Sequence, residues 1–237
     1  MSLANSLIII PTYNESKIIE KVILDIKNEF EGADILVVDA YSNDNTSEIV
    51  KKNNIKIIFV DKYFGIGLAI ETGLYFAQQR NYDYCIRIDG DGQHSANDVK
   101  KNFDYFVKKK IDLLIGSRFL SNSDYKTNNL RMTGINLLRG LLNRFYKVDI
   151  TDCTSGCHIY SKRLVQELVE DDKFEYSEIG AICKASELGF LIQEKPINMQ
   201  PRKTGVSSFN FINSFNYMFK NLLTLILSIN FTYKNKS

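Results

Sequence analysis

The residues best suited to chemistry in this chain are two aspartates in the segment 88–94, which reads I-D-G-D-G-Q-H. Asp89 and Asp91 are separated only by Gly90, and the β-branched and aromatic run 82–88 predicts a strand that ends there. Mg²⁺ and Mn²⁺ are commonly held by one or two carboxylates together with substrate phosphate oxygens, and glycine lets a diphosphate approach the backbone. The segment therefore predicts a metal and diphosphate site. A polar turn is the alternative, because Asp and Gly are also common turn residues.

Composition places the chain among ordinary globular proteins. With 237 residues, 44% of them hydrophobic, it can bury the core of one domain or of two small ones. The formal net charge of +2 gives no case for nucleic acid as a partner. Four scattered cysteines do not form a secreted disulfide framework, so a reducing, cytoplasmic setting is expected.

A zinc site is a weaker interpretation of the cysteines. Cys153, Cys157 and His158 lie close together in the sequence, but no second ligand pair stands at a suitable spacing. We therefore expect ordinary buried thiols at these positions.

Short apolar segments alternate with helical patterns in the first half of the chain, which is typical of an α/β fold with a mainly parallel sheet. Strands are predicted at 7–10, 35–38, 55–60, 84–88 and 113–116, and helices at 15–30 and 66–79. Ligands of such sheets collect beyond the carboxyl ends of the strands. Polar segments follow the first, second and fourth predicted strands, at 11–15, 39–46 and 89–94, so we expect these three segments to meet at one site.

The segments I-I-I-P-T-Y-N-E, V-V-D-A-Y-S-N-D-N-T, I-D-G-D-G-Q-H and G-S-R-F, in this order and spacing, resemble the inverting family 2 glycosyltransferases. That resemblance implies the GT-A fold, an α/β fold that binds nucleotide-diphosphate sugars. Two later segments, D-C-T-S-G-C at 152–157 and P-R-K-T-G-V-S-S at 201–208, are most similar to the dolichyl-phosphate mannosyltransferases and bacterial polyprenyl-phosphate glycosyltransferases. The resemblance therefore implies a polyprenyl phosphate as the acceptor.

Carried over by motif position, the resemblance also implies roles for individual residues. Asp89, Asp91 and Gln93 would hold the metal, and Asp39 would accept a hydrogen bond from the base of the nucleotide. The remaining nucleotide-sugar contacts would come from Pro11, Tyr13, Glu15, Gly90, Arg118, Arg131, Arg202 and Lys203, the basic ones facing phosphates.

The chain departs from the family pattern in two places. The second segment usually carries two adjacent aspartates, but here Ala40 and Tyr41 follow Asp39. The stretch before the third helix commonly carries a basic residue, whereas 63–67 reads Y-F-G-I-G. We expect retained activity with an altered nucleotide or sugar preference.

The acceptor decides whether a general base is needed. A lipid phosphate is already anionic and needs only positioning, whereas a hydroxyl acceptor must lose its proton to a base. Glu178, in the predicted helical stretch 177–189, is the candidate base. It is equally well interpreted as an acidic residue favoured in a helix's first turn.

The C-terminal segment is basic and amphipathic. No acidic residue follows Lys195, and apolar residues recur at helical spacing at Phe211, Phe215, Met218, Phe219, Leu222, Leu223, Ile226 and Ile229. The apolar run 222–229 is far shorter than the ~20 residues that a spanning helix needs. We expect a GT-A domain at 1–206 and an amphipathic helical extension at 207–237 that lies on the membrane surface; packing on the domain or on a second subunit is the alternative.

The sequence thus predicts a metal-dependent inverting glycosyltransferase, using Mg²⁺ or Mn²⁺, peripheral at the cytoplasmic face of a membrane. It does not distinguish a GDP-sugar from a UDP-sugar as donor. A glycan hydroxyl as acceptor and a non-catalytic sugar-nucleotide binding protein are the alternatives. A dehydrogenase is disfavoured, because G-I-G-L-A-I at 65–70 lacks the third small residue of a dinucleotide-binding motif.

Overall fold

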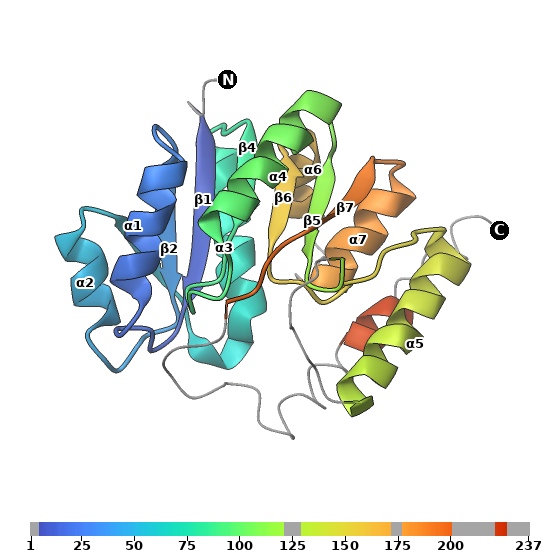
Figure 1. Ribbon diagram of the computed structural model, residues 1–237, viewed down its shortest axis with the longest axis horizontal. Coiled ribbons are helices and arrows are strands. Elements are labelled where there is room, and N and C mark those ends of the chain that lie inside the picture. The colour runs from blue at the N-terminus through green and yellow to red at the C-terminus, as the bar shows by residue number, and fades with distance from the viewer. Residues whose placement is uncertain (1–4, 121–128, 172–176, 201–220, 227–237) are drawn as a thin grey trace.

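A seven-stranded sheet with the order β3-β2-β1-β4-β6-β5-β7 forms the centre of the molecule (Figure 1). The computed structural model describes residues 5–120, 129–171, 177–200 and 221–226. The strands are β1 (Ser6–Thr12), β2 (Asp34–Asp39), β3 (Lys56–Phe59), β4 (Tyr84–Arg87), β5 (Leu113–Ser117), β6 (His158–Ser161) and β7 (Ile192–Pro196). Within this sheet only β6 runs antiparallel to its neighbours.

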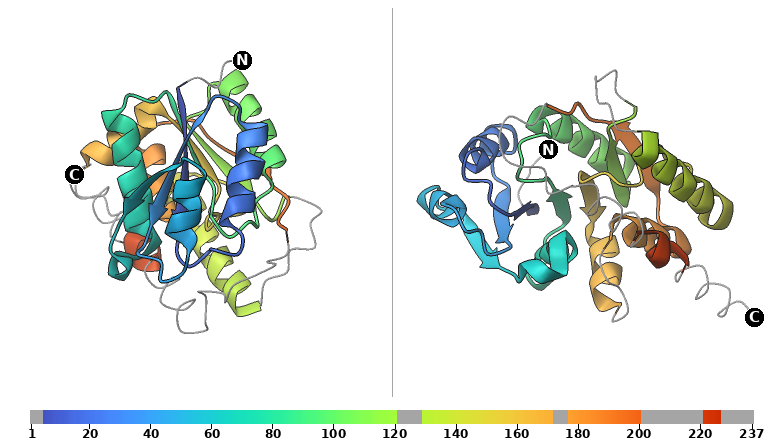
Figure 2. Two further views of the ribbon diagram at one scale, coloured as in Figure 1. Left: turned by 90° about the vertical axis from the view of Figure 1, so that its left-hand side faces the viewer. Right: turned by 90° about the horizontal axis from the view of Figure 1, so that it is seen from below.

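Helices cover both faces of the sheet, giving three layers (Figure 2). They are α1 (Ile19–Glu29), α2 (Thr46–Lys52), α3 (Gly65–Gln79), α4 (Ala96–Lys109), α5 (Asn129–Tyr146), α6 (Lys162–Glu170) and α7 (Glu178–Glu187), with a 3-10 turn η1 (Lys62–Phe64) before α3. One hydrophobic core joins the sheet to α1, α2 and α4, and the other joins it to α3, α5, α6 and α7. This is the predicted α/β class.

The apolar runs of the strands arise because both faces of the sheet are buried. In β1, Ile8 and Ile10 belong to one core, while Leu7 and Ile9 belong to the other. Such a strand has no solvent face and therefore shows no alternation of polar and apolar residues. All five predicted strands are present, and no end differs from the prediction by more than two residues.

The first helix begins later than predicted, at Ile19 instead of residue 15. The backbone N–H groups of Glu15 and Ser16 donate to the side chains of Thr46 and Asp44, so this part of the chain is bound to the segment after β2. These contacts hold residues 13–18 as a loop at the carboxyl end of β1.

Only a short part of the C-terminal extension is described, the helical stretch 221–226. Leu225 is fully buried in the core that also contains residues of α5 and α7, whereas Leu223 and Ile226 are exposed. The rest of 207–237, and with it the predicted amphipathic helix, lies outside the described residues. Among the described helices, none is both long enough and apolar enough to cross a bilayer.

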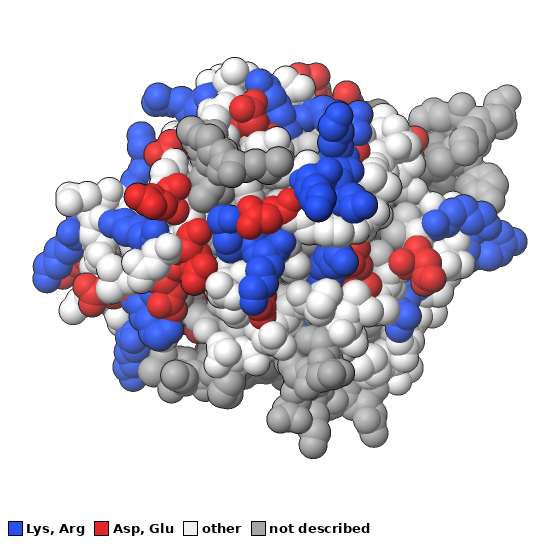
Figure 3. Space-filling view, turned by 45° about the horizontal axis from the view of Figure 1, so that its top comes forward, with Lys and Arg blue, Asp and Glu red and all other residues white. Residues whose placement is uncertain are grey.

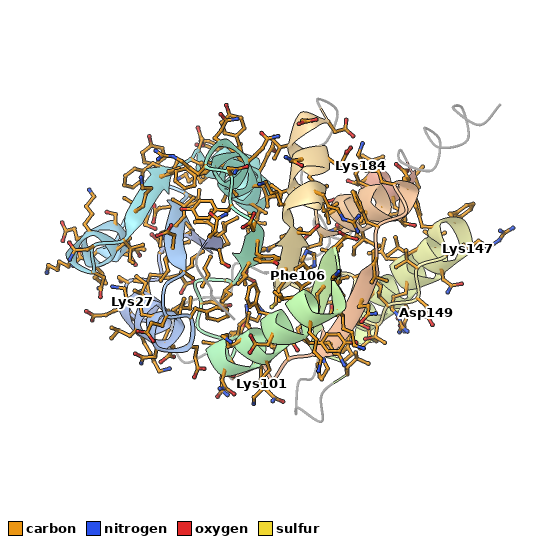
Figure 4. The ribbon with its side chains drawn as sticks, turned by 90° about the horizontal axis from the view of Figure 1, so that it is seen from above. Lys27, Lys101, Phe106, Lys147, Asp149 and Lys184 are labelled. Atoms are coloured by element: carbon orange, nitrogen blue, oxygen red, sulfur yellow. The ribbon has the colours of Figure 1, made fainter. Side chains whose placement is uncertain are left out.

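The surface at the amino-terminal ends of the strands carries interspersed charges of both signs (Figure 3). Helix α4 shows how one element divides its residues between surface and core (Figure 4). Phe106 is buried against the sheet, whereas Lys101 extends into solvent. The polar residues of the predicted site lie at the opposite, carboxyl edge.

Two helix glycines provide a test of this packing. A Cβ at Gly73 in α3 would lie 2.5 Å from Cγ2 of Ile9 in β1, whereas a Cβ at Gly140 in α5 would meet no atom within 4 Å. Alanine is favoured over glycine in a helix by about 1 kcal/mol, but overpacking costs about 1–3 kcal/mol. We expect Gly73→Ala to lower the free energy of unfolding by about 1 kcal/mol and Gly140→Ala to raise it, measured by urea denaturation. Equal effects of the two substitutions would contradict the close approach of α3 to β1.

Candidate active site

The carboxyl ends of three parallel strands lie side by side at one edge of the sheet. The pairing of β1 with β2 places Thr12 beside Asp39, and the pairing of β1 with β4 places Ile9 beside Arg87. The polar segments that follow these strands therefore leave the sheet next to one another. This confirms the predicted convergence of the three segments.

Asp39 organises the loops after β1 and β2. Its side chain is buried, and its Oδ1 accepts a hydrogen bond from the backbone N–H of Ser42 at 2.7 Å. Its Oδ2 accepts from the hydroxyls of Ser42 at 2.7 Å and Thr12 at 3.2 Å. The Ser42 hydroxyl oxygen in turn accepts from the backbone N–H of Asn14 at 2.8 Å. A carboxylate at position 39 thus links the two loops.

Aromatic rings lie at the same edge. Tyr41 adopts a left-handed backbone conformation with φ of +53°, and its ring stacks on that of Phe59 at 5.5 Å. Tyr13 is 38% exposed, while Pro11 and Glu15 are buried at the end of β1. Pro11 and Asp39, near the ends of β1 and β2, and Tyr13 and Glu15, in the loop after β1, are the residues that the resemblance places around the nucleoside, and all four lie at this edge.

The loop after β4 carries the paired aspartates and packs closely on the end of β1. The N–H of Gly90 donates to the carbonyl of Pro11 at 3.3 Å, and a Cβ at Gly90 would lie 2.6 Å from Thr12 Cγ2. Only glycine permits this approach. Asp91 Oδ1 accepts from the backbone N–H of Gln93 at 3.0 Å, which gives the loop the turn geometry that was the alternative interpretation of this segment. A turn and a ligand site are compatible here.

Asp89 is held between two supports. Its backbone N–H donates to Nδ1 of His94 at 3.2 Å, and its carboxylate rests on Gly156 in the segment before β6. A Cβ at Gly156 would lie 1.9 Å from Asp89 Oδ2, closer than any two such atoms can approach. The absence of a side chain at position 156 is therefore a condition for the position of this carboxylate.

Arg87, the last residue of β4, lies behind Asp89 with only 2% of its side chain exposed. Its Nη1 donates to Glu178 Oε1 at 2.8 Å, and its Nε lies 3.4 Å from Asp89 Oδ1. Burial alone would raise the pKa of Glu178, but the adjacent Arg87 guanidinium holds that pKa below its usual value. Glu178 is thus an ionised, ion-paired carboxylate in the first turn of α7, which makes it a weaker proton acceptor.

His158 is a third buried polar residue, beside Arg87 and Glu178. It pairs with Arg87 across the β4–β6 ladder, and its Nδ1 lies 2.8 Å from the hydroxyl of Tyr160. Burial, assisted by the charge of Arg87, lowers the pKa of His158 to about 3. The imidazole is therefore neutral at physiological pH.

Arg118 follows β5 and is directed into the protein. Its guanidinium donates to both carboxylate oxygens of Asp152, at 2.7 and 2.6 Å, and to the carbonyl and hydroxyl of Thr154 at 2.9 Å. Burial would raise the pKa of Asp152, but hydrogen bonds and charge from Arg118 lower it. These contacts tie the end of β5 to the segment 152–157. The predicted contact between Arg118 and phosphate stays a prediction.

The remaining predicted phosphate ligands are placed only in part. Arg131 lies in the first turn of α5. Gln93 exchanges hydrogen bonds with Gln200, through its Nε2 to the Gln200 carbonyl at 3.3 Å and from the Gln200 N–H to its own carbonyl at 2.8 Å. The described segment 177–200 therefore ends beside the aspartate loop. Arg202 and Lys203 lie outside the described residues.

Asp89 and Asp91 fit part of the ligand set of a hard divalent cation, whose other oxygen ligands would come from outside the protein. Asp89 and Asp91 are both partly exposed and supply carboxylate oxygens. Within the described ranges, no three His, Cys, Asp or Glu side chains form a group that could hold a metal ion alone. An ion at this loop would depend on diphosphate oxygens and water for its other ligands. The four cysteines are buried and unpaired by disulfides.

Three residues of this site were not identified from the sequence: Arg87, Gly156 and His158. The signal for Arg87 was present, because an arginine inside an otherwise apolar strand next to two aspartates needs a buried partner. Gly156 belongs to the family-like segment D-C-T-S-G-C and His158 to the weak zinc pattern, but neither pattern predicts a position behind the aspartate loop. Their positions depend on β6, a strand that the pattern did not predict.

Comparison with known proteins agrees with the fold and identifies the family. The family described as glycosyl transferase family 2 matches residues 7–169. Polyprenol monophosphomannose synthase of Mycolicibacterium smegmatis is 27% identical over 225 residues, covering 91% of this chain and 84% of that protein. A UDP-N-acetylglucosamine–dolichyl-phosphate N-acetylglucosaminyltransferase of Methanococcus voltae is 29% identical over 215 residues, covering 80% and 83%.

Among solved structures, glucosyl-3-phosphoglycerate synthase from Mycobacterium tuberculosis, crystallised with Mn²⁺, UDP-glucose and phosphoglyceric acid, superposes with a TM-score of 0.70. The match covers 96% of this chain and 80% of that one at 16% identity, which establishes a common GT-A fold. Because the family match spans most of the chain and includes the aspartate loop and the two loops beside it, the chain belongs to glycosyl transferase family 2.

Proposed function

We propose that this glycosyltransferase moves a sugar from a nucleoside-diphosphate sugar to a polyprenyl phosphate, with inversion at the anomeric carbon. The observation that carries the proposal is the position of the Asp89–Asp91 loop, bonded to the end of β1 beside the loops that Asp39 joins. A nucleoside in those loops would place its diphosphate next to the two carboxylates.

In this proposal Asp91, Asp89 and Gln93 hold a Mg²⁺ or Mn²⁺ ion together with the diphosphate. A cation bound there would neutralise charge that develops on the leaving diphosphate. The protein fixes the geometry, because Gly90 brings the loop onto the backbone of Pro11 and Gly156 supports Asp89. Arg131, Arg202 and Lys203 are proposed as further phosphate contacts.

The lipid acceptor is supported by the relatives that are named for it. Proteins 24–29% identical to this chain include enzymes named for polyprenol, dolichyl-phosphate and undecaprenyl-phosphate substrates. A lipid phosphate is an anionic nucleophile that needs no proton acceptor, so this chemistry requires mainly positioning and charge compensation. A hydroxyl acceptor would instead require a base, and Glu178, the residue predicted for that role, is ion-paired with Arg87 at 2.8 Å.

The first test concerns the metal carboxylate. We expect Asp91→Asn to abolish Mn²⁺-dependent sugar transfer, because an amide is a much weaker ligand for a hard cation. Asp104→Asn, at an exposed position of α4, is the matched control and should keep full activity. Transfer to polyprenyl phosphate would be measured with UDP- and GDP-sugars. Full activity of Asp91→Asn would rule out this site.

Thermal shift separates loss of chemistry from loss of binding. Mn²⁺ with the correct nucleoside diphosphate should raise the melting temperature of the wild-type protein, since a ligand that binds the native state stabilises it. The same addition should have little effect on Asp91→Asn. Stabilisation of the wild type without any turnover would favour a non-catalytic binding protein.

The second test concerns the support of Asp89. Gly156→Ala places a methyl group where the Asp89 carboxylate lies, so the carboxylate must move. A misplacement of about 1 Å at a reacting centre can reduce turnover by about 10²-fold. We expect a loss of this order in kcat/KM, with circular dichroism confirming the fold. Gly140→Ala, at an exposed helix position, should leave kcat/KM unchanged.

The third test concerns the proposed membrane contact of the C-terminal extension. Leu223 and Ile226 are three residues apart on one helical face, exposed by 46% and 44%. We expect the double substitution Leu223→Ser/Ile226→Ser to reduce flotation with anionic liposomes. Leu24→Ser, equally exposed on α1, should not change flotation. Unchanged flotation with a changed oligomeric state would indicate a subunit contact.

A further inference from the structure

Arg87 is a positively charged side chain buried between two carboxylates. It ends a central strand, its side chain is 2% exposed, and Glu178 is only 5% exposed. Burying a charge without a partner is very costly, so the position of Arg87 depends on these acids. Neither the mechanism proposed above nor the family segments of the sequence assign it a function.

The two carboxylates do not share Arg87 equally. Glu178 Oε1 lies 2.8 Å from Nη1, a short charge-assisted hydrogen bond, whereas Asp89 Oδ1 lies 3.4 Å from Nε. Glu178 therefore provides most of the compensation for the positive charge. The charge of Asp89 remains available at the partly exposed loop, while its carboxylate is oriented from behind by the guanidinium.

We propose that Arg87 is a positioning residue for the metal-binding carboxylate Asp89, and that Glu178 is the counter-ion of Arg87 and not a proton acceptor. The proposal rests on the function proposed above and deepens it. Groups that orient metal ligands from the second layer commonly change metal affinity by about 10- to 100-fold when they are removed. Arg87 holds one side of Asp89, and Gly156 holds the other.

The proposal has an electrostatic consequence. If Glu178 loses its charge, Asp89, whose Oδ1 lies 3.4 Å from Arg87 Nε, carries more of the compensation for the guanidinium. Asp89 would then be drawn toward the guanidinium and would attract a divalent cation less strongly. A proton acceptor behaves differently, because its loss slows the chemical step and leaves metal binding unchanged.

Two variants test the proposal. Glu178→Gln removes the counter-ion while keeping the shape of the side chain. Arg87→Met/Glu178→Met removes both charges together, so no unpaired charge is left in the interior. This double variant keeps the proposal testable if Glu178→Gln does not fold. The control is Asp112→Asn/Arg163→Met, which removes an ion pair just before β5. This pair lies at the amino-terminal ends of the parallel strands, opposite the end that carries the Asp89–Asp91 loop.

Mn²⁺ binding is measured by electron paramagnetic resonance in saturating UDP and, in a parallel series, in saturating GDP. Turnover is measured across a Mn²⁺ titration. We expect the dissociation constant for Mn²⁺ to rise by about 10-fold or more in both test variants and to stay unchanged in the control. The lost turnover should be recovered in large part by raising the Mn²⁺ concentration.

Wild-type Mn²⁺ affinity in the test variants, with turnover that no Mn²⁺ concentration restores, would overturn the proposal and identify Glu178 as the proton acceptor. Loss of the acidic limb of the pH–rate profile in Glu178→Gln would support that reversal. Absence of Mn²⁺–nucleotide binding by the wild-type protein would instead disprove the proposed function itself, and with it the role of Arg87.

Discussion

The site depends on the parallel pairing of β1 with β2 and β4. Hydrogen bonds continue past the regular strands, from Ala40 to the Thr12 carbonyl and from Gly90 to the Pro11 carbonyl. Parallel strands end at the same edge, so three loops distant in sequence meet there. Hydrogen bonds between the loops after β1 and β2, such as that from the Asn14 N–H to the Ser42 hydroxyl, then hold them together. A shift of this register would separate Asp39 from the Asp89–Asp91 loop and leave no place for a nucleoside diphosphate.

Much of this arrangement could be predicted because it follows from local patterns. Buried parallel strands are apolar on both faces, and the polar residues that interrupt them mark strand ends, which located Asp39, Asp89 and Asp91 correctly at one edge. The pattern failed for β6 and β7. The first is four residues long and contains His158, and the second reads I-Q-E-K-P, so neither carries the apolar signal of a buried strand. What could not be predicted, the position of Gly156 behind Asp89, depends on that missed strand.

Buried charge has two different uses in this molecule. Arg118 binds Asp152 and Thr154 with several short hydrogen bonds and holds the end of β5 to the segment before β6. Arg87 joins the aspartate loop to α7 through Glu178. Both pairs are expensive to desolvate, and a hydrophobic pair of equal volume would stabilise the fold as well or better. Their value lies in orientation, since a guanidinium fixes the direction of each carboxylate that it touches.

The antiparallel strand β6 gives the site a particular order of assembly. It lies between β4 and β5 and pairs Ile86 and Leu114 with Ile159, so the two halves of the sheet are joined only after about two thirds of the chain is available. Non-local pairings of this kind form slowly, because a long loop must close before any contact stabilises it. Residues 5–120 can pair β1 to β4 early, whereas the contact between the Asp89 carboxylate and Gly156 forms only when the segment before β6 is in place. During synthesis on the ribosome, the loops after β1, β2 and β4 can therefore assemble before Gly156 fixes the Asp89 carboxylate.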